Sequence, residues 1–143
     1  MLMSEFQHNI DKKGRVFIPA KLREDLGDRF VISKSLDSSP CLFIYSMEEW
    51  QKLVDKLNEQ PFVKARKLQR YLFSGAAELE PDAQGRVLLP QTLREFAQLM
   101  DSASATIIGA SNRIEIWSSE NWIKENEDVS QEEILNILED CNL

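Results

Sequence analysis

Two arginines, Arg15 and Arg86, are the side chains whose type and spacing most clearly suggest chemistry, because they hold the same place in a repeated motif. Residues 11–24 and 82–95 share the pattern D-x-x-G-R-V-x-x-P-x-x-L-R-E. Eight identities in 14 residues at a constant offset of 71 exceed what composition supplies, so the chain contains two copies of one structural unit. An arginine guanidinium can bind a carboxylate, a phosphate or the edge of a guanine.

The residues alone leave two interpretations of these arginines open. In the structural one, each guanidinium binds an aspartate or a helix end, in its own copy or the other copy, and fixes the assembly. In the functional one, Arg15 and Arg86 project to DNA phosphates or guanine edges, and Lys12 and Lys13 add attraction to the DNA backbone. Only the first copy has these two lysines, which favours it as the stronger ligand surface.

The remaining motif residues are expected to build the frame that positions the arginines. Asp11 and Asp82 would accept backbone N–H groups of the turn, while Gly14 and Gly85 would take a positive φ. Extended segments on both sides of the turn predict a hairpin, and the proline that follows suits the start of a short helix. The secondary basic candidates on these helices are Lys21, Arg23 and Arg94.

Hydrophobic periodicity and punctuation predict the same series of elements twice. Strands are expected at 5–10, 15–18, 30–32, 42–45, 76–79, 87–89, 106–108 and 114–117. Ser46 resembles an N-cap with Glu49 completing a capping box, and Ser118 repeats it at an offset of 72. Further helices are expected after Pro61 to near Gly75 and, as an acidic amphipathic segment, over 129–138.

The formal net charge of −7 is unfavourable for binding nucleic acid, but the charge is unevenly distributed. Residues 1–74 carry 13 basic and 10 acidic side chains, whereas residues 75–143 carry 4 and 14. The first half can therefore offer a locally basic surface to an anion. A second basic run, Lys64, Arg66, Lys67 and Arg70, is most often a solvated helix face and is kept as a secondary contact candidate.

The inventory of reactive residues argues against an enzyme. The single histidine, His8, has no counterpart in the second copy, so we expect it to be structural. No Gly-rich phosphate loop, nucleophile elbow or metal-ligand spacing occurs, so neither a cofactor nor a metal is expected. Cys41 and Cys141 are expected to be free thiols. The absence of a long apolar run predicts a cytosolic protein with no membrane partner. Because no catalytic set of residues is found, no small-molecule substrate is expected either.

The sequence as a whole resembles the MraZ family of bacterial transcription regulators, which are built from two AbrB-like units. The resemblance rests on the two D-x-x-G-R motifs, their V-x-x-P-x-x-L-R-E continuations and the Arg-Ile-Glu-Ile-Trp segment at 113–117, and it covers nearly the whole chain. Ser4 stands where the family is expected to have glycine, which concerns only the geometry of the first strand.

The resemblance implies an α+β fold in which two tandem AbrB-like units of the swapped-hairpin type form a β-rich pseudo-dimer with flanking helices. Residues 1–75 would be the first unit with its connecting helices, and residues 76–143 the second unit with the acidic C-terminal helix. A ring-shaped homo-oligomer is also implied. This agrees with an independent argument, because quasi-symmetric halves with unlike surfaces tend to associate head to tail and close into rings.

The implied function is sequence-specific binding of double-stranded DNA at direct repeats upstream of the chain's own operon, in the division and cell-wall gene cluster. Such a protein would be found at the nucleoid. Carried onto this sequence, the DNA contacts fall on Arg15 and Arg86, supported by Lys13 and Lys12. The alternatives are a structural protein whose motif only locks a ring together, and an antitoxin-like protein whose acidic tail wraps a basic partner.

Overall fold

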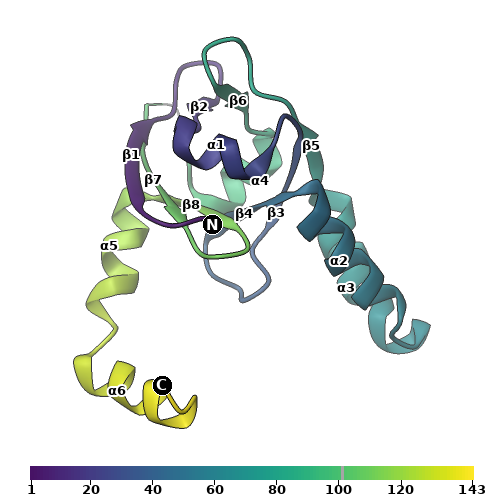
Figure 1. Cartoon of the computed structure of the whole chain (residues 1–143). Helices are drawn as coiled ribbons and strands as arrows, with labels where there is room; N and C mark the ends of the chain where they lie inside the picture. The colour runs from purple at the N-terminus through teal and green to yellow at the C-terminus, as the bar shows by residue number, and fades with distance from the viewer. Residues whose placement is uncertain (101) are drawn as a thin grey trace.

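The computed structural model describes residues 1–100 and 102–143 (Figure 1). The elements follow in the order β1 (Glu5–Asn9), β2 (Arg15–Phe17), α1 (Ala20–Leu26), β3 (Phe30–Lys34), β4 (Cys41–Ser46), α2 (Met47–Asn58), α3 (Phe62–Gly75), β5 (Ala77–Leu79), β6 (Arg86–Leu88), α4 (Gln91–Ala97), β7 (Ser104–Gly109), β8 (Ile114–Ser118), α5 (Ser119–Glu127) and α6 (Gln131–Asp140). The second seven elements repeat the type and order of the first seven, which confirms the duplication. The paired strands are all antiparallel, and the fold is of the mixed α+β class.

The two copies exchange strands. A six-stranded sheet has the order β1-β7-β8-β4-β3-β5, and β2 and β6 form a separate two-stranded ribbon. Strand β1 of the first copy pairs with β7 of the second, β5 of the second pairs with β3 of the first, and the copies meet where β4 pairs with β8. Because each copy completes the sheet of the other, the two halves of the sequence are joined in one hydrogen-bonded structure.

The hairpin expected across each motif turn is wrong in its pairing. β1 and β2 flank the turn at residues 11–14, but β1 joins the large sheet while β2 pairs with β6 of the other copy. The period-two pattern of a strand indicates which of its faces is buried but does not specify the strand with which it pairs. The positions of both strands are therefore predicted correctly, whereas their pairing is not.

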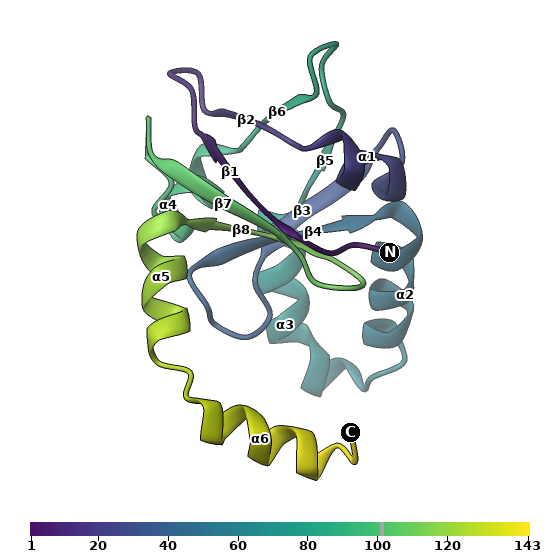
Figure 2. The same ribbon diagram turned by 60° about the vertical axis from the view of Figure 1, so that its left-hand side comes forward.

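The main apolar core lies between one face of the six-stranded sheet and a layer formed by α1, α4 and the ribbon (Figures 1 and 2). The inward side chains of the central pair of strands, Leu42, Ile44, Ile114 and Ile116, are fully buried. Burying each such side chain contributes about 1.5–3 kcal/mol. These residues lie at the centre of the sheet. The layer that carries both motif turns therefore packs on a buried apolar core.

The opposite face of the sheet carries a smaller aromatic cluster. Phe43, Tyr45 and Trp117 point to this side, where Trp50 of α2 and Trp122 of α5 pack against them. Helices α2 and α3 lie along one flank and α5 along the other (Figures 1 and 2). Trp50 and Trp122 are therefore partly buried against the sheet, although α5 has no fully buried residue.

Serine caps begin both tryptophan-bearing helices. The hydroxyl oxygens of Ser46 and Ser118 accept the N–H groups of Glu49 and Asn121, each at 3.1 Å. Only this half of the expected capping box is seen at Ser46, because the Glu49 carboxylate binds Lys52 at 3.2 Å. In the described part of the chain, none of the helices is both long and apolar enough to cross a membrane.

Candidate nucleic-acid interface

The ribbon of β2 and β6 lies at one end of the molecule (Figure 2). Its antiparallel register places Arg15 opposite Leu88 and Phe17 opposite Arg86. Since side chains alternate along a strand, the central valines point into the core, where Val16 is 1% exposed. The two arginines and the two apolar side chains therefore share the outer face of the ribbon.

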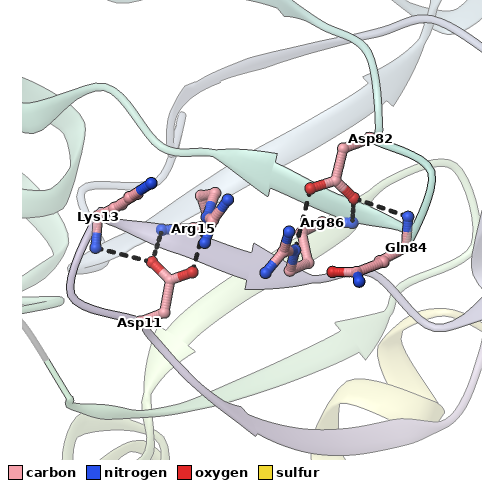
Figure 3. A network of polar contacts seen from close by, with 6 residues as sticks. All are labelled: Asp11, Lys13, Arg15, Asp82, Gln84 and Arg86. Atoms are coloured by element: carbon pink, nitrogen blue, oxygen red, sulfur yellow. Dashed lines mark hydrogen bonds and ion pairs between the residues drawn. The ribbon is translucent and has the colours of Figure 1, made fainter.

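In the first copy, Asp11 fixes both the turn and the arginine (Figure 3). Its carboxylate accepts the backbone N–H of Lys13 at 2.9 Å and that of Arg15 at 2.8 Å. The same carboxylate accepts the Arg15 Nε–H at 2.7 Å. Among the described residues, the two terminal amino groups of the guanidinium find no hydrogen-bond acceptor, so they remain available to a ligand.

The second copy repeats this arrangement. Asp82 accepts the backbone N–H groups of Gln84 and Arg86 and the Arg86 Nε–H, each at 2.9 Å. The backbone hydrogen bond from the arginine is the main cause that holds the pKa of each carboxyl, Asp11 and Asp82, below its ordinary value. Both aspartates are therefore charged at neutral pH and orient their arginines as ionic partners.

The first turn rests on the helix of the second copy. The carbonyl oxygen of Gly14 accepts the backbone N–H of Leu89 at 3.0 Å. Gly14 has the positive φ, +83°, that the motif predicts, and a Cβ at this position would lie 2.7 Å from Cζ of Arg94. Glycine is thus required both by the backbone conformation and by the guanidinium packed beneath it.

The second turn rests in the same way on the helix of the first copy. The Gly85 carbonyl accepts the Ile18 N–H at 2.9 Å. Gly85 has a φ of +83°, and its Cβ would lie 2.8 Å from Cζ of Arg23. The two turns, and with them the two outer arginines, are consequently fixed relative to each other by reciprocal contacts between the copies.

The basic candidates divide into an outer and an inner group. Lys12 and Lys13 are exposed at the first turn and Lys21 is exposed on α1. Arg23 and Arg94 are half-buried, and their Nε–H groups donate to the Ile18 and Leu89 carbonyls at 2.8 and 3.3 Å. The structure therefore brings the turn lysines together with Arg15 and places Arg23 and Arg94 behind the turns. The basic run at residues 64–70 lies on α3, on the far side of the sheet from the ribbon.

Two apolar residues of the outer face escaped the sequence analysis. Leu88 is 57% exposed beside Arg15. Phe17 lies beside Arg86 and contacts His8 edge-on, with ring centroids 4.9 Å apart. His8 therefore packs against an aromatic ring, as expected for a histidine with a structural role. The alternation of Val16 with Phe17 was the signal that could have placed the phenylalanine on the arginine face.

The acidic C-terminal region lies at the other end of the molecule from the ribbon. Helices α5 and α6 extend away from the sheet on the side opposite β2 and β6 (Figure 1). The strongest negative charge of the chain is therefore separated from the outer face. Within residues 1–100 and 102–143, no group of His, Cys, Asp and Glu side chains is arranged to hold a metal ion.

Comparison with known proteins identifies the family of this chain. A family profile described as "MraZ protein, putative antitoxin-like" matches residues 1–70 and again residues 72–140. The chain is 52% identical over 147 aligned positions to the "Transcriptional regulator MraZ" of Heliobacterium modesticaldum, with both chains covered completely. It is 51% identical over 128 positions to the protein of the same name from Desulforamulus reducens, covering 88% of this chain and 87% of that one. A third such protein, from Thermoanaerobacter sp., is 49% identical with complete coverage of both chains. The chain therefore belongs to the MraZ family.

Proposed function

We propose that this protein is a DNA-binding transcriptional regulator that reads direct repeats upstream of its own operon, in the division and cell-wall gene cluster, with the ribbon of β2 and β6. The observation that carries the proposal is the pair of aspartate-held arginines, Arg15 and Arg86, on one outer face of that ribbon. The relatives are named as transcriptional regulators, and the family is non-enzymatic, in agreement with the expectation from the residues.

The two-stranded form and the side chains of the ribbon suit the major groove. The groove of B-DNA admits a two-stranded ribbon, and an arginine pairs with O6 and N7 of guanine through two parallel hydrogen bonds. Asp11 and Asp82 engage only Nε of each guanidinium, which leaves the terminal amino groups for the base. Fixing the long side chain before binding also reduces the entropy lost on complex formation.

The residues next to the two arginines are proposed to make the other contacts with DNA. Lys12 and Lys13 are exposed at the tip of the first turn and would contact phosphates, which positions the ribbon without reading sequence. Leu88 and Phe17 add apolar contacts, for which the methyl group of thymine is the natural partner. The second turn has no lysine, so the first copy is proposed to bind more strongly.

We also propose that the repeated unit is AbrB-like, with units at residues 1–75 and 76–143, and that the protein forms a ring-shaped homo-oligomer. Exchange of β1 and β5 between the copies supports a swapped-hairpin unit. A ring that presents several ribbons suits a promoter with several direct repeats, because linked weak contacts raise avidity without new chemistry. The nucleoid is the proposed location, as it follows from DNA binding.

Footprinting on the chain's own upstream DNA tests the proposal. The intact protein should protect several evenly spaced short segments, whereas Arg15→Ala should lose this protection at the same protein concentration. A Glu127→Lys variant on α5 serves as the control, since it changes an exposed charge at the end of the molecule opposite the ribbon. Equal protection by the Arg15→Ala variant would refute the assignment of Arg15 as a base-contacting residue.

The structural alternative also expects each arginine to bind an aspartate of its own copy, as Arg15 and Arg86 do through Nε. Light scattering separates the two, because in the structural alternative Arg15→Ala changes the oligomer mass while any DNA binding is insensitive to sequence. The antitoxin-like alternative requires a small basic partner, and copurification of such a protein would favour it.

A further inference from the structure

Helix α6 presents an apolar face that nothing in its own chain covers. Ile134, Ile137, Leu138 and Cys141 are spaced i, i+3, i+4 and i+7, so they lie on one side of the helix. Every residue from position 123 to the C-terminus is exposed, and Ile137 is 50% exposed. A sustained apolar stripe of this kind on a surface helix indicates a binding face.

The equivalent helix of the first copy is covered. Helix α3 follows α2 just as α6 follows α5, and it buries Ala65 and Leu72 next to Leu57 of α2. By contrast, α6 turns away from α5 and lies beyond the body of the molecule (Figures 1 and 2). The second copy has therefore kept the helix while losing its intramolecular partner.

Acidic side chains border the apolar stripe of α6 on one side. Glu133 and Asp140, seven residues apart, mark this border, whereas Glu132 and Glu139 lie on the back of the helix. The helix has no basic residue. Within the part of the chain that the structure describes, none of these four carboxylates forms an ion pair. A matching partner should therefore combine exposed apolar groups with basic ones.

The exposed side of α3 has this combination. Phe62, Arg66, Arg70 and Phe73 are spaced 4, 4 and 3 residues apart and share a face, on which the two phenylalanines are 68% and 37% exposed. Lys64 and the other lysine of the helix extend the basic charge. Across residues 1–100 and 102–143, the basic side chains of α3 take part in no ion pair.

We infer that α6 of one chain binds the exposed face of α3 on a second copy of the same chain. The apolar stripe of α6 meets Phe62 and Phe73, while its acidic border meets Arg66 and Arg70. Helices α3 and α6 lie apart from each other (Figure 1), so each chain offers one face as donor and the other as acceptor. Such a contact is heterologous and propagates head to tail, closing when the rotation between copies permits.

This inference rests on the self-association proposed above and is independent of DNA binding. Charge reversal tests it, with mass measured by light scattering. Glu133→Lys with Asp140→Lys reverses the charge of the acidic border of α6 and leaves its apolar stripe unchanged. Arg66→Glu with Arg70→Glu changes the acceptor face. Circular dichroism checks that each variant is folded.

Each pair of reversals should lower the mass toward the 16.5 kDa of a single chain, and the chain carrying all four should regain the wild-type mass. The control, Glu24→Lys with Glu95→Lys on α1 and α4, should keep the wild-type mass. Undiminished mass in both reversed pairs, or loss in both without recovery in the combined chain, would overturn this contact. A wild-type protein with the mass of one chain would overturn the proposed self-association as well.

Discussion

Replacing Gly85 by alanine tests the reciprocal packing of turns and helices on which the placement of both arginines depends. The residue has a φ of +83° and lies against the guanidinium of Arg23, whose Nε–H donates to the Ile18 carbonyl at 2.8 Å. A Cβ would approach Cζ of that guanidinium to 2.8 Å, so the arginine must move. Two separable effects are expected, one from the backbone and one from the side-chain contact.

Their magnitudes follow from the geometry. A left-handed conformation at a residue with a Cβ costs about 1–2 kcal/mol. Displacing Arg23 gives up a charge-assisted hydrogen bond, which contributes about 1.5–3 kcal/mol. Gly85→Ala should therefore lower the free energy of unfolding by roughly 2.5–5 kcal/mol, and Arg23→Ala by roughly 1.5–3 kcal/mol. In the double variant the hydrogen bond of Arg23 is lost only once, so its loss should fall short of the sum by about 1.5–3 kcal/mol.

Urea unfolding followed by tryptophan fluorescence measures these differences. Gly75→Ala is the matched control, since its added Cβ would meet its nearest neighbour, Cε of Lys34, at an ordinary 3.6 Å. It should leave the free energy of unfolding unchanged or slightly raised. If the Gly85→Ala and Arg23→Ala effects added within about 0.5 kcal/mol, the proposed packing of guanidinium against glycine would be refuted.

Three further predictions concern acid, a buried carboxylate and a buried thiol. Because the folded-state pKa of Asp11 and of Asp82 is lowered, their contribution to stability is present above the unfolded pKa and is lost as pH falls through the folded pKa; replacing both by asparagine should flatten the acid limb of a stability–pH curve, and an unchanged limb would contradict this. Glu115, 6% exposed, accepts an indole N–H at 2.9 Å and an arginine N–H at 2.7 Å; Glu115→Leu should lower the free energy of unfolding by about 1–3 kcal/mol in denaturant titration because the buried indole N–H loses its acceptor, and an unchanged free energy would refute a structural role. Burial raises the pKa of the Cys41 thiol; a disulfide reagent should label Cys41 far more slowly in the folded protein than in urea, and equal rates in the two conditions would count against the buried position of Cys41.

The duplication and most strands and helices could be predicted from the sequence because they depend on local patterns. The repeated motif carries its own turn residues, and Gly14 and Gly85 both have the positive φ that the pattern requires. The serine caps at Ser46 and Ser118 were likewise recognisable, since capping depends on residues only three apart.

Which strands pair with each other could not be predicted from local sequence patterns. Nothing in the residues flanking the first turn distinguishes pairing of β2 with β1 from pairing with β6, because the same apolar alternation satisfies either partner. For the same reason the roles of Arg15 and Arg23 could not be separated, although one lies on the outer face and the other behind a turn of the opposite copy. Register across the two copies decides both questions.

The most direct test of the central claim is the ratio of affinities for the chain's own upstream DNA and for a scrambled duplex, measured by fluorescence anisotropy at several salt concentrations. Arg15→Ala should weaken binding to the upstream DNA by about 1–3 kcal/mol while changing scrambled DNA little, so the ratio should fall. Lys13→Ala, a matched change at the same turn, should weaken both duplexes alike and reduce the salt dependence. A ratio that Arg15→Ala leaves at the wild-type value at every salt concentration would contradict the account.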